Sequence, residues 1–266
     1  MGVVPVAFDP THRAPFGLPA LDSSLAGGLT HQTMTVVAGS LGAGKTLLGL
    51  HFLLAGVARG EPGLWLGFHE TREQLLARAA QHRLDLAAAV EEDSVELMVQ
   101  PPIDLDPDIL AHRLAAAVEA RGVRRLVIDS VGELEQAVES NRVNTYLAAL
   151  VGHLRRLRVT VFFTKEISRT FTAEVDFTDL PISLLAENVL LLRHVQFQNE
   201  LHRTLAVLKM RFSAHDRRIR EFTIDERGIR VLAREESATS VLEGIATAAA
   251  ATDAHQTPPM PGETRP

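Results

Sequence analysis

Residues 39–46 have the composition and spacing of a phosphate-binding loop. They read Gly-Ser-Leu-Gly-Ala-Gly-Lys-Thr, which fits the pattern G-x-x-x-x-G-K-[ST]. The glycines let consecutive backbone N–H groups turn inward around a β-phosphate, and Lys45 adds a positive charge for the β and γ oxygens. The Thr46 hydroxyl can join the oxygen shell of a magnesium ion. The helix that follows points the positive end of its dipole at the same anion.

A magnesium ion in such a site also needs a carboxylate from a neighbouring strand. The apolar run Leu-Val-Ile at 126–128 ends in Asp129, so we expect Asp129 and Thr46 to hold the ion. The alternative is that Asp129 only caps the next helix. These residues therefore predict a site for a nucleoside triphosphate with Mg²⁺. The residues of the loop expected to contact the nucleotide are Ser40, Leu41, Gly42, Ala43, Gly44, Lys45, Thr46 and Leu47.

Hydrolysis further requires a group that orients or deprotonates the attacking water. His69 and Glu70 follow the strand expected over 63–68, so Glu70 would face the γ-phosphate from the end of that strand. A carboxylate here can instead stabilise the dipole of the following helix. Neutral His69 could accept a proton near pH 7, or it could be a partly buried histidine bonded to backbone. Both residues are candidate catalytic groups together with Lys45.

Short apolar runs alternate with amphipathic stretches through the first 163 residues. This alternation predicts an α/β fold with a mostly parallel sheet covered by helices. Residues 165–181 are expected to form a long loop, and the strands after it are expected to pair antiparallel. The expected strands cover 34–38, 63–68, 95–99, 126–128, 159–163, 188–195, 201–210, 221–224 and 229–232, and the expected helices cover 45–59, 71–82, 84–91, 107–121 and 143–157.

Composition sets the protein class. The 266 residues are 46% apolar, carry a net charge of −6 and include no cysteine. The absence of cysteine excludes disulfides and thiol catalysis. The negative net charge argues against binding of nucleic acid through the electrostatic attraction of the whole chain. No signal peptide or membrane-length apolar run is evident, so we expect a cytoplasmic protein. We expect one ATPase domain over 1–232 and a disordered tail over 233–266, which is rich in alanine, threonine and proline.

Several segments together resemble the KaiC-type ATPases of the RecA superfamily, from about residue 17 to residue 232. Gly-Leu-Pro-Ala-Leu-Asp at 17–22 and Gly-Gly-Leu at 27–29 are similar to the family's lead-in to the phosphate loop. Leu-Lys-Met-Arg at 208–211 is similar to the segment that reaches a neighbouring subunit's nucleotide. Residues 217–224 look closest to the second of the two domains in the family's clock protein.

The resemblance implies a RecA-like P-loop fold and a homo-oligomeric ring, usually a hexamer, with ATP at the subunit interfaces. Lys209 and Arg211 would then act on a neighbour's γ-phosphate. Arg211 would neutralise charge in the transition state, an effect of about 10³–10⁵ in rate in related systems. Met210, Ser213 and His215 would lie near the same nucleotide. Without the resemblance, Lys209 and Arg211 indicate only an exposed, solvated strand edge.

Two positions depart from the family pattern. His69 stands where the family carries the first of two paired glutamates, so hydrolysis should be slow or depend on Glu70. Ser183 matches the serine of the phosphorylated Ser-Thr pair in the clock protein, but Leu184 replaces the threonine. A two-site phosphorylation cycle is therefore excluded, and phosphorylation of Ser183 alone stays open. Because the chain holds one ATPase unit and the clock protein two, we infer no circadian role.

Three functions remain open from the sequence. The leading hypothesis is a slowly hydrolysing oligomeric ATPase that regulates an unknown protein partner. The second is a recombinase-like protein that binds single-stranded DNA through the 165–181 loop, where Lys165, Arg169, Phe171 and Phe177 offer charge and stacking surface. Acidic residues in that loop and the net charge oppose it. The third is a nucleotide-dependent scaffold that does not hydrolyse ATP, motivated by His69.

Overall fold

Helices and strands alternate along most of the chain in the computed structural model, which describes residues 8–103, 105–167, 182, 185–197 and 199–232. The helices are α1 (Pro19–Ser24), α2 (Lys45–Val57), α3 (Arg72–Gln81), α4 (Leu86–Glu91), α5 (Pro107–Arg121), α6 (Val131–Ala137) and α7 (Val143–Arg156). The strands are β1 (Arg13–Ala14), β2 (Leu29–Thr30), β3 (Met34–Gly39), β4 (Gly63–Gly67), β5 (Val95–Val99), β6 (Arg125–Asp129), β7 (Thr160–Glu166), β8 (Asn188–Phe197), β9 (Glu200–Met210), β10 (Arg220–Asp225) and β11 (Gly228–Val231).

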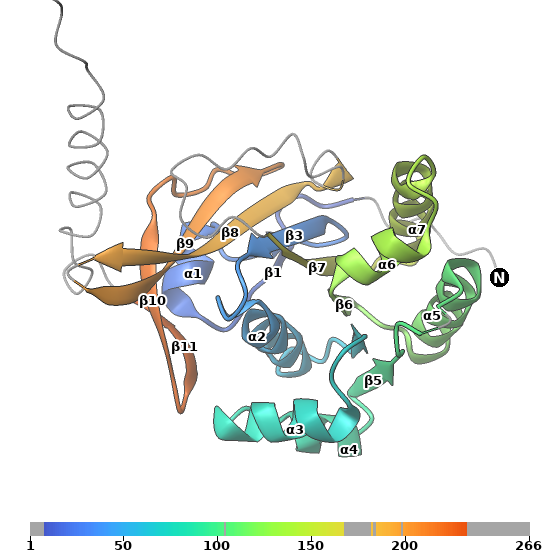
Figure 1. Ribbon diagram of the computed structural model, residues 1–266, viewed down its shortest axis with the longest axis horizontal. Coiled ribbons are helices and arrows are strands. Elements are labelled where there is room, and N and C mark those ends of the chain that lie inside the picture. Colours follow the sequence, from blue (N-terminus) through green and yellow to red (C-terminus); the bar gives the residue numbers. More distant parts are fainter. Residues whose placement is uncertain (1–7, 104, 168–181, 183–184, 198, 233–266) are drawn as a thin grey trace, which may run out of the picture.

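Within the described residues, nine strands form one sheet in the order β11-β10-β9-β8-β3-β7-β6-β4-β5 (Figure 1). The pairs from β8 through β3 to β5 are parallel, and the pairs from β8 through β9 to β11 are antiparallel. This arrangement confirms the expected mostly parallel α/β sheet with an antiparallel C-terminal extension. Strand β8 joins the two parts, because it runs parallel to β3 and antiparallel to β9.

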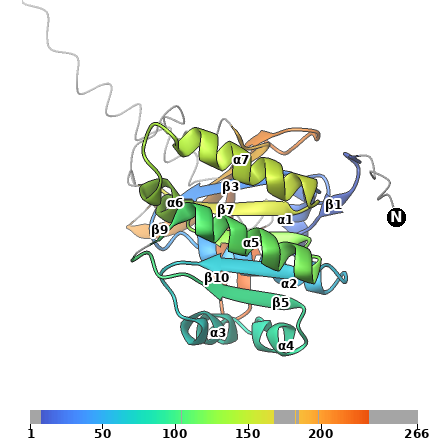
Figure 2. The same cartoon turned by 90° about the vertical axis from the view of Figure 1, so that its right-hand side faces the viewer.

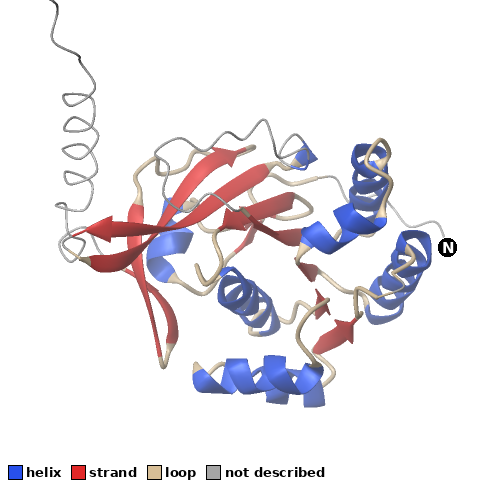
Figure 3. Cartoon of the chain, in the orientation of Figure 1, coloured by secondary structure: helices blue, strands red, loops and turns tan. Residues whose placement is uncertain are grey.

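Each face of the sheet packs against its own set of helices. Side chains alternate along a strand, so Val37 and Phe162 face the core beneath α2, whereas Val36 and Phe163 face the core beneath α5 and α7. Figure 2 shows α5, α6 and α7 together on one side, and Figure 3 shows helices on both sides of the strands. Two buried cores thus hold the central strands rigidly, which fixes the positions of the residues at their ends.

Local sequence signals explain where the helices begin and end. Thr71 accepts a hydrogen bond from the Gln74 backbone and Gln74 bonds back, a capping box that starts α3. Asp106 caps α5, Pro107 occupies its first turn, and Gly122 ends it in the left-handed conformation with φ of 62°. The prediction of a helix over 107–121 is confirmed.

The structure corrects three expectations about the elements. Strand β7 continues through Lys165 and Glu166, which were expected in a loop, because their backbones pair with Ala38 and Gly39. Helices α1 and α6 were not expected from the sequence, since each is too short for a clear helical period. The rest of the expected loop, 168–181, and the expected tail, 233–266, lie outside the described residues. Among the described helices, none has the length and apolar character needed to cross a membrane.

Candidate nucleotide site

A cavity of about 760 Å³ opens where the central parallel strands end. Its wall includes the loop after β3, residues 67–70 at the end of β4 and just beyond it, Asp129 at the end of β6 and Lys165 near the end of β7. Open α/β sheets bind ligands at this carboxyl edge, because several parallel strands end there together. The register of the sheet therefore brings residues from four distant segments to one pocket.

The phosphate loop has the backbone that its glycines predict. Gly42 and Gly44 have φ of 71° and 98°, a region that other residues rarely adopt. Gly44 also lies against the C-terminal extension, because a Cβ there would approach Ile224 Cδ1 to 2.9 Å. Residues Leu41, Gly42, Gly44, Lys45, Thr46 and Leu47 line the cavity, while Ala43 is buried in the core and the Ser40 hydroxyl lies 3.2 Å from His194 Nδ1.

Lys45 is held in place by the loop itself. Its Nζ donates hydrogen bonds to the carbonyl oxygens of Gly39 at 2.9 Å and Ser40 at 2.8 Å, and the residue is only 9% exposed. Burial lowers the pKa of Lys45, while the nearby carboxylates of Glu166 and Asp129 act in the opposite direction. The ammonium group is thus fixed at the mouth of the loop before any anion arrives.

Thr46 and Asp129 meet as the sequence predicts. The Thr46 hydroxyl donates to Asp129 Oδ2 at 2.8 Å, and the Thr164 hydroxyl donates to the other carboxylate oxygen. A hydroxyl and a carboxylate in contact beside a phosphate loop are hard oxygen donors of the kind that Mg²⁺ prefers. The residues present therefore fit a magnesium ion, and Thr164 orients the carboxylate that would hold it.

His69 and Glu70 both line the cavity, and each has a charged partner. His69 Nε2 lies 2.9 Å from Glu133 Oε1, and the Glu70 carboxylate forms an ion pair with Arg78 of α3. A histidine that donates Nε2–H to a carboxylate keeps Nδ1 as its proton acceptor. The ion pair with Arg78 holds the Glu70 carboxylate against α3. The contact with Glu133 orients the His69 ring and therefore its acceptor nitrogen.

Sequence reasoning missed several residues of this cavity, of which Glu133 matters most. Glu133 lies in the first turn of α6, four residues after Asp129. The feature of the sequence that could have identified it is a carboxylate just beyond a strand that ends in aspartate. Missing α6 therefore meant missing Glu133. The other missed lining residues include Trp65, Arg78, Gln136, Glu166 and Ile224.

The Lys-x-Arg segment lies at the other edge of the sheet. Met210 pairs with Asn188, and Asn188 pairs with Thr35 near the start of β3, whereas the phosphate loop follows Gly39 at its end. Because a strand rises by about 3.3 Å per residue, the part of β3 between Thr35 and Gly39 is roughly 13 Å long. The segment and the phosphate loop are separated by this distance along the strand direction. Lys209 donates to the Ala186 carbonyl oxygen at 2.6 Å, and Arg211 is exposed. None of the five expected residues of this segment lines the described cavity.

The side chains of this segment differ in burial. Met210 packs in the core beneath α2, so its side chain faces the interior of the chain. Ser213 and His215 are partly exposed, and the Ser213 hydroxyl donates to the Ala214 carbonyl oxygen. Exposed apolar side chains flank the segment, with Leu208 at 40% and Phe212 at 52% exposure.

Other candidate residues from the sequence are only partly described. Lys165 forms an ion pair with Glu135 of α6 at the cavity wall. Arg169, Phe171 and Phe177 of the expected DNA-binding loop, and also Ser183 and Leu184, lie outside the described residues. Of the four residues on which the DNA hypothesis depends, Lys165 is the one described, and Glu135 matches its charge.

The mostly parallel sheet, the glycine-rich loop after β3 and the carboxylate at the end of β6 define a RecA-like P-loop fold. The sequence model of the KaiC ATPase family matches residues 14–236. The chain belongs to the KaiC ATPase family.

Curated relatives agree with this assignment. The chain is similar to the circadian clock protein KaiC3 of Synechocystis sp. (28% identity over 87% of this chain and 46% of the relative). It is also similar to the circadian clock oscillator proteins KaiC of Picosynechococcus sp. (29%, covering 81% and 42%) and of Thermostichus vulcanus (27%, covering 88% and 45%). The chain thus spans less than half the length of these relatives, as a single KaiC-like domain does.

Proposed function

We propose that this chain is a slow, magnesium-dependent ATPase that assembles into a homo-oligomeric ring and regulates a protein partner in the cytoplasm according to its nucleotide state. The observation that carries the proposal is the convergence of Lys45, Thr46 and Asp129 at one cavity. Family membership supports ATP as the nucleotide. The slow rate, the ring and the regulatory role are the parts that experiment must establish.

In this proposal the residues of the loop bind and orient the triphosphate. The backbone N–H groups of 40–47 surround the phosphates, and Lys45 exchanges its two carbonyl partners for the β and γ oxygens. Thr46 and Asp129 would hold Mg²⁺, which neutralises charge on the phosphates when bound. Trp65, at the cavity wall and buried beneath α2, keeps the floor of the site rigid and dry.

Water activation falls to His69 and Glu70. With Glu133 accepting a hydrogen bond from Nε2, His69 can take a proton at Nδ1, and Glu133 stabilises the imidazolium that results. Glu70 can orient the same water only when its carboxylate turns from Arg78. Such a site works less readily than one with two free carboxylates, which is the physical reason to expect slow turnover.

Assembly would complete the site. Lys209 and Arg211 lie at the sheet edge remote from the chain's own phosphate loop, so they can reach a triphosphate only across an interface with another copy. The exposed Leu208 and Phe212 beside them offer apolar surface for such an interface. Met210, which faces the core, would contribute backbone alone, and Ser213 and His215 would contact the neighbour's nucleotide. Ring size stays a proposal, with a hexamer as the family's usual state.

The decisive experiment measures mass and phosphate release on one sample. Purified chain is sized by light scattering with and without ATP and Mg²⁺, and released phosphate is counted in the same tube. We expect ATP to increase the mass and turnover to be slow but measurable. Lys45→Ala should lose ATP affinity and assembly together, whereas Arg124→Ala, which removes an exposed cation away from the cavity, should match the wild type.

Each contrary outcome identifies an alternative. Assembly with no phosphate release above that of Lys45→Ala would indicate the non-hydrolysing scaffold. A salt-sensitive shift of labelled single-stranded DNA would favour the recombinase-like function. Added mass of one phosphate after incubation with ATP, lost in Ser183→Ala, would establish phosphorylation of Ser183.

A further inference from the structure

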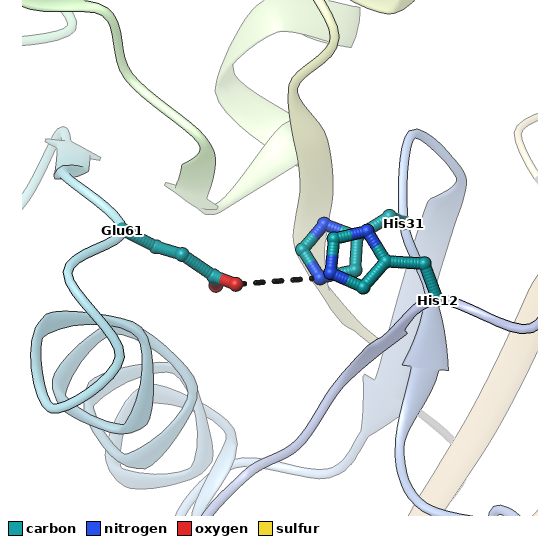
Figure 4. Close-up of side chains that lie close together, drawn as sticks. All are labelled: His12, His31 and Glu61. Atoms are coloured by element: carbon teal, nitrogen blue, oxygen red, sulfur yellow. Dashed lines mark ion pairs between the residues drawn. The ribbon is translucent and has the colours of Figure 1, made fainter. Parts of the chain in front are cut away.

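Two histidines and a glutamate converge at the edge of the fold remote from the nucleotide cavity. His12 precedes β1, His31 follows β2, and Glu61 lies in the connection between α2 and β4. Each residue offers one ligand atom, and these atoms lie within 4.8 Å of one another. Figure 4 shows the two imidazole rings stacked one in front of the other, with the Glu61 carboxylate facing them. The three residues come from separate segments, so tertiary structure alone brings them together.

His31 Nε2 is a buried polar atom that the chain leaves without a hydrogen bond. The His31 side chain is 9% exposed, and Nε2 has no hydrogen-bond partner among the described residues. Its separation from Glu61 Oε1 is 3.4 Å, an ion-pair distance without hydrogen-bond geometry. Leaving such a group unsatisfied lowers the stability of the fold. A ligand that used this nitrogen would remove this loss of stability.

The protonation of His31 suits a metal ligand. Burial lowers the pKa of His31 to about 4, even though Glu61 opposes that shift. The imidazole is therefore neutral at pH 7, which is the form that binds metal ions.

The surrounding contacts place the three residues next to one another, and binding one metal ion would require the two rings to tilt out of their stack. The His12 and His31 rings stack at 3.9 Å between centroids, and the His31 backbone N–H donates to the His12 carbonyl oxygen at 3.0 Å. Arg125, fully buried, donates to Glu61 Oε2 at 2.6 Å and leaves Oε1 toward the histidines. Arg59 Nε lies 3.8 Å from Oε1 and is half exposed. The positive charges of Arg59 and Arg125 weaken the attraction between Glu61 and a cation, so we expect the three residues to bind a metal ion with moderate affinity.

We propose that His12, His31 and Glu61 bind one Zn²⁺ ion. Two imidazoles and a carboxylate match the nitrogen and oxygen ligands of zinc, with water completing four-coordination. Mg²⁺ prefers oxygen ligands and is disfavoured by this set. Bound zinc would tie the two-stranded sheet of β1 and β2 to the connection between α2 and β4. The site is independent of the nucleotide cavity, and its failure would leave the proposed ATPase function untouched.

The test is zinc titration of untagged full-length chain that has been stripped with chelator and kept free of nucleotide. Calorimetry with ZnCl₂ should give one site with a dissociation constant in the micromolar range or below, and MgCl₂ should give none. His12→Ala removes an exposed ligand and should weaken zinc binding at least tenfold. The matched control is His112→Ala, which removes an exposed histidine from α5 and should bind as the wild type does.

Thermal unfolding provides the second measurement. Because a ligand that binds the folded state raises its stability, zinc should raise the Tm of the wild type and of His112→Ala but not of His12→Ala. If His12→Ala unfolds earlier than the wild type in chelator alone, His12→Gln replaces it in both measurements. The proposal is overturned if zinc does not bind, or if it binds the wild type and the His12 variants with equal affinity.

Discussion

The Thr46 hydroxyl donates a 2.8 Å hydrogen bond to Asp129 Oδ2, although the two residues are 83 positions apart. Thr46 lies in the first turn of α2 and Asp129 ends β6, so the contact joins the segment after β3 to a strand two places away from β3 in the sheet. The same carboxylate accepts from Thr164 at the intervening strand β7. The packing of the chain therefore brings together the two residues proposed to hold Mg²⁺.

The first prediction concerns this carboxylate. Asp129→Asn keeps an oxygen that accepts from Thr46, so the fold should be retained, but it removes the negative charge that would hold Mg²⁺. We expect the magnesium concentration for half-maximal ATP binding to rise about 10–100-fold, in line with changes around metal ligands in general. Fluorescent ATP titrated at several magnesium concentrations measures the effect. Unchanged magnesium dependence would remove Asp129 from the metal site.

The second prediction concerns His69 and its partner. Glu133→Gln weakens the orientation of His69, and we expect turnover to fall about tenfold with little change in ATP affinity, as for a group that acts in the chemical step. His69→Glu restores a carboxylate and should move the acid limb of the pH–rate profile to lower pH, since carboxylates lose their protons at lower pH than imidazole.

The matched comparison for this pair is Glu70→Gln. If Glu70 alone activates water, Glu70→Gln abolishes turnover and His69→Glu leaves the pH profile where it was. If His69 is the acceptor, the profile moves and Glu70→Gln retains measurable activity. Initial rates between pH 5 and 8 separate the two cases.

The third prediction tests whether Arg211 acts on a neighbour. Arg211→Ala should lower turnover about 10³-fold or more, and the exposed Arg217→Ala should not. When Arg211→Ala and Lys45→Ala chains are mixed without nucleotide and ATP is then added, some interfaces combine an intact phosphate loop with an intact Arg211. Phosphate release should then exceed the sum of the separate variants. Strict additivity at every mixing ratio, in samples that light scattering shows to contain assemblies of both variants, would show that Arg211 does not act across an interface.

The fourth prediction concerns stability at acid pH. His51 in α2 is buried, and its Nε2 accepts a 3.0 Å hydrogen bond from the Ile229 N–H. Burial lowers the pKa of His51 to about 4, below an unfolded value of about 6.5. The unfolded chain thus binds more protons between these values. The contribution of neutral His51 to the free energy of unfolding is fully present above about pH 6.5. It is lost as the pH falls toward 4, and the loss amounts to about 2 kcal/mol between pH 7 and pH 5.

Urea unfolding of the wild type and His51→Gln at pH 7 and pH 5 checks this prediction. Glutamine can accept the Ile229 hydrogen bond but does not titrate, so the variant should lose less stability on acidification. Lys209→Gln, which replaces a charged, partly buried side chain with the same residue type, serves as the control and should keep the wild-type pH dependence. Equal acid sensitivity in His51→Gln and wild type would contradict the assignment.

Much of the nucleotide site could be predicted from local sequence. Glycines at 42 and 44 allow the left-handed backbone of the loop, and an apolar strand ending in Asp129 indicates the carboxyl edge of a parallel sheet. These features depend on neighbours along the chain, so residue type and spacing are enough to recognise them. The alternation of strands and helices indicates the α/β class for the same reason.

Tertiary structure decided what depends on long-range register and burial. Glu133 reaches His69 from the unexpected helix α6, and β8 joins the parallel sheet because its backbone pairs with β3. His12, His31 and Glu61 meet only through packing of three segments, and burial is the main cause that lowers the pKa of His31 and of His51. The residue types and spacing of a short segment do not determine which distant segments pack against it or how far it is buried. These contacts and protonation states therefore depend on the folded chain.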